Sequence, residues 1–161
     1  MATIEQRLDA LGLSLPPALE APDGSRLPFR FVHVVGRRVY VSGHGPQLPD
    51  GSVAGPFGKV ESDLTLEEGY RAARLTALSM LGSLKRALGE LECIYAWCRV
   101  FGMVNSAPGF RQQPAVINGF SDLILELFGP DRGAHSRSAV GMAELPFGIP
   151  VEIEAELLLF G

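Results

Sequence analysis

The segment "VEIEAELLLF", residues 151–160, constrains the fold more than any other part of the chain. Its apolar and acidic residues alternate, and successive side chains of a β-strand point to opposite faces of the sheet. One face therefore receives apolar side chains only, and the other begins with Glu152, Glu154 and Glu156. A chain that contains this strand needs a sheet with a core on one face and water or another protein surface on the other.

Two segments have the pattern of helices that pack on such an apolar face. Residues 66–88 follow a capping box made by Thr65 and Glu68, and a glycine follows their last turn. A second helix is expected to begin near Pro114, because proline is favoured in a first helical turn, and to run to Gly129.

Runs of β-forming residues bounded by Gly and Pro predict five strands, at residues 29–35, 38–44, 94–104, 136–145 and 151–160. The first two are separated by "GR" and should form a hairpin. The resulting order, ββ-α-β-α-ββ, predicts an α+β fold in which two helices lie on one face of a mixed sheet. Residues 1–28 are expected to add a short helix and a proline-rich arm to a core of residues 29–161, all in a single domain.

The composition limits the classes of partner. The net charge is −4, the pI is about 5.4, and no basic stripe is available to neutralise a phosphate backbone, so nucleic acid is not expected as a partner. No run approaches the roughly 20 apolar residues of a membrane helix, so no membrane partner is expected. The three histidines are far apart in the sequence and no His/Cys cluster has metal-ligand spacing, so neither a metal nor another cofactor is expected.

The two cysteines, Cys93 and Cys98, are expected to remain free thiols. They lie in one segment and should point to opposite faces of a strand, which does not favour a disulfide between them. Free thiols suit a reducing cytoplasm, and the first residues lack the basic and apolar regions of a secretory signal. Cys98 is expected to be a buried, small apolar residue.

Three further motifs are more specific. Residues 135–155 are "HSRSAVGMAELPFGIPVEIEA", residues 40–46 are "YVSGHGP", and residues 116–129 are "VINGFSDLILELFG". In this order they resemble the RidA/YjgF family, which is also labelled the endoribonuclease L-PSP or translation-inhibitor family. The resemblance covers about residues 29–160. It implies a chorismate-mutase-like (ferredoxin-like) α+β subunit, and a homotrimer whose ligand clefts lie between neighbouring subunits.

The resemblance also implies an activity, the hydrolysis of reactive enamines or imines to 2-oxo acids and ammonia, with a small carboxylate or imino acid as the ligand. Arg137 then holds the substrate carboxylate and Glu152 orients the attacking water. Ser42 and Gly43 fall on the family's serine-glycine at a strand end, and Asn118 falls on the asparagine of its second helix.

Three positions of the implied pocket depart from the family. Ala139 stands where the family usually has a cysteine, two residues after the arginine. Phe29 stands at a tyrosine position, and His44 replaces the glutamine that follows Ser-Gly. The hydroxyl and thiol that would shape a pocket for a small 2-imino acid are therefore missing, while the arginine and the glutamate are present.

Several of these residues have plainer interpretations without the family. A strand arginine is most often a solvent-facing charge, although the planar guanidinium of Arg137 also suits a carboxylate. Glutamates at period two are most often a solvated face, and only Glu152 has a catalytic interpretation, as a base or acid acting on water. His44 is either an acid–base group or a strand-end residue bonded to backbone, and Asn118 is equally suited to a local helix role. Ser42 has no base partner at hand, which leaves it a hydrogen-bonding role rather than a nucleophilic one.

The spacing of the arginine and the glutamate indicates how the site is assembled. If the chain turns at Gly148, Glu152 lies level with Glu144, seven residues from Arg137. Seven residues of strand span on the order of 23 Å at roughly 3.3 Å per residue. If both groups serve one small ligand, they are therefore expected to come from different chains.

Three functions are consistent with these observations. The first is an imine hydrolase of the 2-iminobutanoate/2-iminopropanoate deaminase type. The second is a non-catalytic or regulatory trimer that binds a 2-oxo acid in the same cleft, which the departures at Ala139 and Phe29 favour. The third, RNA cleavage, follows from a family label alone, and the acidic pI argues against it.

Overall fold

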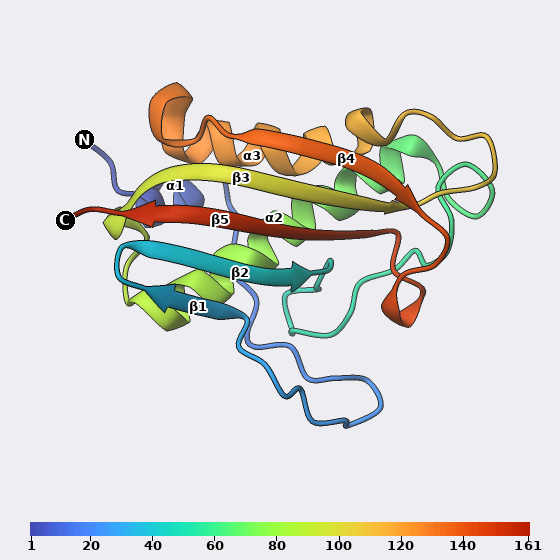
Figure 1. Ribbon diagram of the computed structural model, residues 1–161, viewed down its shortest axis with the longest axis horizontal. Coiled ribbons are helices and arrows are strands. Elements are labelled where there is room, and N and C mark those ends of the chain that lie inside the picture. Colours follow the sequence, from blue (N-terminus) through green and yellow to red (C-terminus); the bar gives the residue numbers. More distant parts are fainter.

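A computed structural model describes all residues, Met1–Gly161, as one sheet with helices packed against it (Figure 1). The elements in chain order are α1 (Ile4–Ala10), β1 (Val32–Val35), β2 (Arg38–His44), α2 (Leu66–Leu88), η1 (Leu91–Cys93), β3 (Ile94–Asn105), α3 (Gln113–Arg132), β4 (Ser136–Met142), η2 (Pro146–Gly148) and β5 (Val151–Leu159). This confirms the predicted α+β class and the order of its elements.

The C-terminal strand β5 lies in the middle of the sheet. The strand order is β1-β2-β5-β3-β4, and β5 is antiparallel to both of its neighbours. Only β3 and β4 run parallel, which makes the sheet mixed, as expected. Because β3 lies between β4 and β5, the last two strands of the chain are antiparallel but do not touch.

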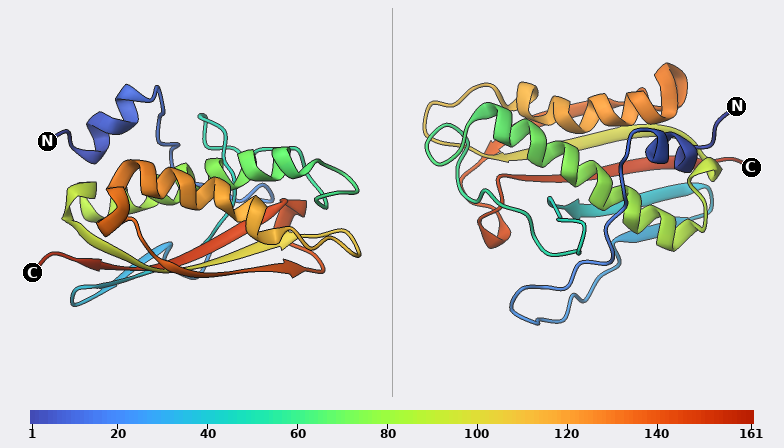
Figure 2. Two further views of the ribbon diagram at one scale, coloured as in Figure 1. Left: turned by 90° about the horizontal axis from the view of Figure 1, so that it is seen from above. Right: turned by 180° about the vertical axis from the view of Figure 1, so that it is seen from behind.

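The two long helices cover one face of the sheet, and the other face is left open (Figure 2). On the covered face, Val151 and Ile153 are fully buried in a core of 30 residues. On the open face, Glu154 and Glu156 are exposed and Glu152 is half-buried. The alternation in β5 therefore gives two chemically different faces, as its sequence predicts.

The long helices approach each other closely because small residues line their contact. A Cβ atom added to Gly119 of α3 would collide with the backbone carbonyl of Tyr70 in α2. Beside this contact the hydroxyl of Tyr70 donates to Asp122 at 2.7 Å. The helix pair is thereby fixed as one layer above the sheet.

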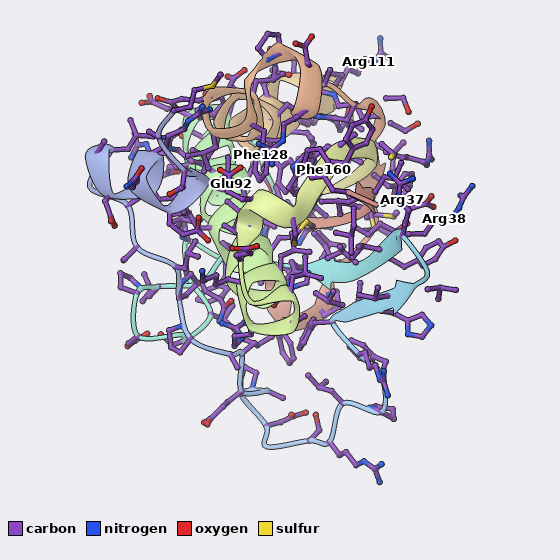
Figure 3. All side chains as sticks on the ribbon, turned by 90° about the vertical axis from the view of Figure 1, so that its left-hand side faces the viewer. Arg37, Arg38, Glu92, Arg111, Phe128 and Phe160 are labelled. Carbon is purple, nitrogen blue, oxygen red and sulfur yellow. The ribbon has the colours of Figure 1, made fainter.

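One end of the molecule is closed by an arginine held between aromatic rings. The guanidinium of Arg132 lies 5.6 Å from the ring centroids of both Phe128 and Phe160 and donates to Glu92 at 3.0 Å. Figure 3 shows Glu92, Phe128 and Phe160 gathered at this end. Tyr95 packs edge-on against Phe160, so the end of β5 is tied to α3 and to the start of β3.

Several boundaries differ from those expected. Strand β1 begins at Val32 rather than at residue 29, and β4 ends at Met142 rather than at residue 145. Helix α3 continues past Gly129, where a φ of 78° produces a kink. Cys98 is exposed, so its expected burial is wrong. The reason is a shift of register in β3 between Trp97 and Arg99, which turns Cys98 toward the open face.

Helix α1 and the residues that follow it lie on the outer side of the helix layer, before the chain loops out beyond the edge of the sheet (Figure 2). Helix α1 begins with a capping box made by Thr3 and Gln6, and it buries Ile4 and Leu8 in the main core. The arm that follows crosses α2, where Arg86 donates to the carbonyl of Pro16 at 2.9 Å. Gly82 leaves room for this contact, because a Cβ atom there would lie 2.9 Å from the same carbonyl oxygen.

A buried histidine of β2, His44, is linked to Arg86 through the hydroxyl of Ser83 in α2. The Nε2 atom of His44 lies 2.8 Å from the Ser83 hydroxyl, which accepts from Arg86 at 3.1 Å, and its Nδ1 atom lies 2.6 Å from the Ser42 carbonyl. Since that carbonyl can only accept, Nδ1 carries the proton and Nε2 accepts from Ser83. Burial, with a smaller contribution from the charge of Arg86, lowers the pKa of His44 from 6.5 to about 4.

Replacing His44 with Gln is expected to make the protein less sensitive to acid. The unfolded chain binds a proton at His44 more tightly than the folded chain does, so this contribution to stability is complete above pH 6.5 and is lost as the pH falls to about 4. The loss amounts to about 3 kcal/mol for the shift from 6.5 to about 4. Urea midpoints measured across this range should fall less for His44→Gln than for the parent. The exposed His33 supplies the control, since His33→Gln should follow the parent curve; parallel curves for all three proteins would contradict the expectation.

Candidate functional site

A hollow of about 220 Å³, which we call the Glu152 pocket, opens beside the end of β2. The N-terminal arm and the β4–β5 connection both lie near this end of β2 (Figure 1). Residues of both segments line the pocket. The walls are mostly apolar, and the only ionisable side chain among them is that of Glu152. The lining residues are Leu19, Leu27, Phe29, Phe31, Gly43, Gly45, Pro46, Gln47, Val53, Pro146, Phe147, Ile149 and Glu152.

A bulge in β2 makes room for the glutamate. Val41 pairs with Ala155 and His44 with Ile153, so three steps along β2 correspond to two along β5. Such an extra residue bends a strand and re-aims its side chains. Gly43, inside the bulge, faces Glu152, and a Cβ atom at Gly43 would lie 2.6 Å from the carboxylate oxygen Oε2. Glycine is therefore required here for the carboxylate to rest against the backbone.

The environment of Glu152 favours its protonated form. Burial raises the pKa of its carboxyl group above the ordinary value, and the neighbouring charge of Glu154 raises it further. No hydrogen bond within the chain opposes these effects. A half-buried, unpaired carboxyl group with a raised pKa near apolar walls has the environment that is typical of a general acid–base group.

Arg137 lies on the other face of the sheet, at the edge beneath α3. Its Nη1 donates to the Ser121 hydroxyl at 3.0 Å and its Nη2 to the Pro114 carbonyl at 3.1 Å. These two partners lie one turn to either side of Asn118, whose exposed side chain shares their face of the helix. We call this group, Arg137, Asn118, Ser121 and Pro114, the Arg137 site. No acidic side chain pairs with the guanidinium, so its remaining N–H groups are free to receive an anion.

A histidine helps to hold the arginine in place. The Nδ1 atom of His135 lies 2.7 Å from the carbonyl of Gly133, and its Nε2 atom lies 2.9 Å from the hydroxyl of Ser121. The Ser121 oxygen therefore accepts from Arg137 and donates to a neutral His135. Burial lowers the pKa of His135, and the charge of Arg137 lowers it further, which keeps the ring in the neutral form that this arrangement needs.

The two groups do not meet within one chain. Arg137 lies level with Val100 of β3, whereas Glu152 lies level with Met103, so they are three residues apart along the strands. The expected offset of seven residues is wrong, because residues 143–150 cross the end of β3 instead of forming a tight turn centred on Gly148. The true offset is about 10 Å along the strands, with two strand spacings of about 5 Å across. The groups also point to opposite faces, so one small ligand cannot contact both in one subunit.

Four of the other predicted residues lie with one or the other of these groups. Phe29 and Gly43 lie with Glu152, whereas Asn118 lies with Arg137, and Ala139 packs against the main core on the same face as Arg137. Ser42 donates from its hydroxyl to the carbonyl of Arg30 at 2.8 Å, and it lines a second hollow on the open face.

His44 stands apart from both places. It is 5% exposed, both of its ring nitrogens are bonded within the chain, and it does not line the Glu152 pocket. Its position is that of a buried structural histidine between β2 and α2.

Sequence reasoning missed two parts of the Glu152 pocket. Leu19 and Leu27 come from the arm, which has no periodic pattern that would place it against the sheet edge. Phe147 comes from the η2 turn and has a left-handed backbone, with φ 59° and ψ 10°. Only the "PFG" turn chemistry could have drawn attention to it.

The open face contains a second, more polar hollow of about 240 Å³. Arg99 and Phe101 of β3 face Glu154 and Glu156 of β5 across it, and no ion pair closes it. No three His, Cys, Asp or Glu side chains converge to hold a metal ion, and no helix is both long and apolar enough to cross a bilayer.

Comparison with known proteins identifies relatives over nearly the whole chain. Residues 5–150 match the family described as "YjgF/chorismate_mutase-like, putative endoribonuclease". Protein TCP17 of Trypanosoma cruzi is 40% identical over 153 residues, which cover 94% of this chain and 91% of that protein. Two crystal structures are also similar. Atu1372 of Agrobacterium tumefaciens, a protein of unknown function, is 37% identical with a TM-score of 0.85, and the match covers 98% of this chain and 92% of that one. A "putative endoribonuclease" of Shewanella oneidensis is 33% identical with a TM-score of 0.89, over 98% and 100% of the two chains.

Glu152→Gln is expected to stabilise the protein at neutral pH. The pKa of Glu152 is raised above 4.5, so its contribution to stability is present below that pH and is lost as the pH rises through the raised pKa. At pH 7 the buried charge therefore destabilises the fold, and the amide removes it. Thermal unfolding should show a higher midpoint for Glu152→Gln at pH 7 and no difference at about pH 4. The exposed Glu156 on the same strand face provides the matched control, Glu156→Gln. A lower midpoint for Glu152→Gln at pH 7 would show that the carboxylate is stabilising.

Proposed function

The chain belongs to the YjgF/chorismate mutase-like family that includes RidA and L-PSP proteins, and from this membership we propose that it hydrolyses 2-imino acids to 2-oxo acids and ammonia. The observation that supports the proposal is the division of the required groups. The Glu152 pocket has an acid–base group and no cation, and the Arg137 site has a free guanidinium and no carboxylate. An imino acid substrate needs both a cation for its carboxylate and a proton carrier for its reacting carbon and nitrogen, and each site provides one of the two.

A homotrimer brings the two together in this proposal. The Glu152 pocket of one subunit faces the Arg137 site of its neighbour, and each cleft contains one copy of each. The open sheet face gives the subunits a surface to share, since Tyr40 is exposed there and lines the second hollow together with Phe101 and the charged residues. Exposed aromatic rings of this kind are typical of surfaces that bind another protein.

The chemistry needs one anchor and one proton carrier. Arg137 receives the substrate carboxylate through paired, charge-assisted hydrogen bonds, while Ser121 and His135 hold the guanidinium in position. The ionised Glu152 accepts a proton from water as the water oxygen bonds to the iminium carbon. It then returns that proton to the nitrogen. The carbon–nitrogen bond breaks, and its electron pair leaves with ammonia. Glu152 accepts the hydroxyl proton as the hydroxyl becomes a carbonyl, and it passes this proton to the ammonia, so that the products are the 2-oxo acid and ammonium.

Modest catalysis is sufficient for this reaction, because free imines already hydrolyse in water. Orientation of the two reactants and one well-placed proton carrier account for the acceleration. Ala139 and Phe29 replace the cysteine and the tyrosine of the family, but neither replacement removes the carboxylate anchor Arg137 or the proton carrier Glu152. A protein that only binds 2-oxo acids would use the same cleft without turnover. Ammonia release from an imino acid distinguishes catalysis from such binding.

We expect substitutions of Arg137 to reduce ligand affinity and a substitution of Glu152 to reduce turnover. A charge-assisted hydrogen bond contributes roughly 1.5–3 kcal/mol, so Arg137→Ala should lower the affinity for a 2-oxo acid by about ten- to a hundredfold. Arg137→Lys should also weaken binding, because lysine lacks the planar pair of donors. Glu152→Gln should bind nearly as well as the parent but lose turnover.

The measurements are calorimetry with the 2-oxo acid product, and ammonia release from an imino acid generated in the cuvette. Arg71→Ala, which removes an exposed arginine from α2, is the control and should change neither. Absence of any acceleration by the parent with imino acids of several sizes would overturn the hydrolase proposal. Binding that survives Arg137→Ala would overturn the assignment of the carboxylate anchor.

A further inference from the structure

The Glu152 pocket has more apolar wall than a small imino acid requires. Its lining includes Leu19 and Leu27 of the arm, Phe29 and Phe31, and Phe147 of the η2 turn. A hollow of about 220 Å³ compares with the roughly 30 Å³ that one water molecule occupies in the liquid. It therefore has room for a compound with a side chain the size of leucine or phenylalanine.

The only other side chain with hydrogen-bonding groups in the wall is already satisfied. Gln47 is 4% exposed and donates to the carbonyls of Pro17 at 3.2 Å and Gly51 at 2.8 Å. Its own carbonyl accepts a short hydrogen bond from the hydroxyl of Ser79 in α2. Gln47 therefore holds the arm in place rather than binding a ligand. Glu152 is left as the only unpaired polar side chain facing the hollow.

The arm is fixed well enough to act as a wall. Its start is held by Arg86, which donates to the carbonyl of Pro16, and the next carbonyl, of Pro17, is held by Gln47. The ring of Pro17 packs on Gly51, where a Cβ atom would lie 2.8 Å from the proline Cγ. Leu19 follows Pro17 by two residues, so these contacts hold it against the pocket.

Phe147 occupies its place at a conformational cost. Its φ of 59° lies in the left-handed region, which glycine adopts freely and a bulky aromatic residue does not. The residue is nevertheless 46% exposed and so gains little from burial in the chain. Residues held in such strained conformations cluster at ligand sites, and a partly exposed ring that lines an apolar hollow is suited to covering a bound apolar group.

We propose that the arm and Phe147 make this pocket selective for imino acids and 2-oxo acids with branched aliphatic or aromatic side chains. The apolar group fills the space between the arm leucines and Phe147, and the carbon that carries the nitrogen or oxygen faces Glu152. A methyl side chain leaves most of this space unfilled. The inference rests on the proposed function for the location of the reacting carbon, and it adds the class of substrate.

Calorimetry with two 2-oxo acids tests the selectivity without requiring turnover. Each buried methylene group raises affinity by about fourfold. 4-Methyl-2-oxopentanoate has three more carbon atoms than pyruvate and should bind at least about tenfold more tightly. Equal affinity for the two acids would overturn the proposal.

Variants of the arm test which residues are responsible. The double change Leu19→Ala and Leu27→Ala should reduce the preference to about threefold or less. Leu15→Ala is the matched control, because Leu15 lies in the same arm but packs against the main core, and it should retain the preference. Phe147→Gly provides an independent readout, since glycine relieves the left-handed backbone and preserves the fold while it removes the ring. It too should lower the preference. A preference that is unchanged in both wall variants would overturn the role of the walls.

Hydrolysis assays on the same variants separate this inference from the proposed function. Rapid hydrolysis of small and large imino acids alike, unaffected by the wall variants, supports the hydrolase and overturns the selectivity. Wall-dependent binding of large 2-oxo acids without any hydrolysis supports the selectivity and overturns the hydrolase. Failure of the parent to bind either acid overturns both.

Discussion

The alternation in β5 governs the rest of the structure. This strand lies in the middle of the sheet, so every second side chain must enter the core beneath α2 and α3, and the side chains between them must go to the open face. Its apolar residues contribute to the 30-residue core, and its glutamates are thereby directed away from the helices. Glu152 and the apolar residues of the core belong to the same strand, so the strand cannot shift its register by one residue without exposing the apolar set.

The same constraint separates the two halves of the proposed site. Arg137 belongs to the covered face, where α3 offers a serine hydroxyl and a backbone carbonyl to hold a guanidinium. Glu152 belongs to the open face, where the bulge at Gly43 lets its carboxyl group lie against backbone in an apolar pocket. Each environment suits its own group, because an arginine needs acceptors and an acid–base carboxyl group needs partial desolvation. Only a second copy of the chain can join them around one small ligand.

Much of this arrangement follows from local rules that the sequence displays. The hairpin, the capping boxes of α1 and α2, and the separation of the β5 faces all depend on neighbours within a few residues. The burial of Cys98 and the offset between Arg137 and Glu152 were predicted wrongly, because both depend on irregularities that no periodic pattern reveals. The bulges in β2 and β3 decide where Gly43 and Cys98 point, and the long crossover between β4 and β5 sets the offset of Arg137 from Glu152. The arm reached the pocket through contacts distant in sequence, such as that between Arg86 and Pro16.

Complementation between variant subunits tests the division of the site most directly. Arg137→Ala and Glu152→Gln subunits would be co-expressed with different tags, and hybrids carrying both tags would be purified and assayed for imino acid hydrolysis. Every hybrid trimer has two subunits of one kind and one of the other, so one of its three clefts takes a native arginine from one subunit and a native glutamate from the next. A split site therefore predicts that the purified hybrids regain about a third of the parental activity, although each variant alone is nearly inactive. Hybrids no more active than the separate variants would contradict a site shared between subunits.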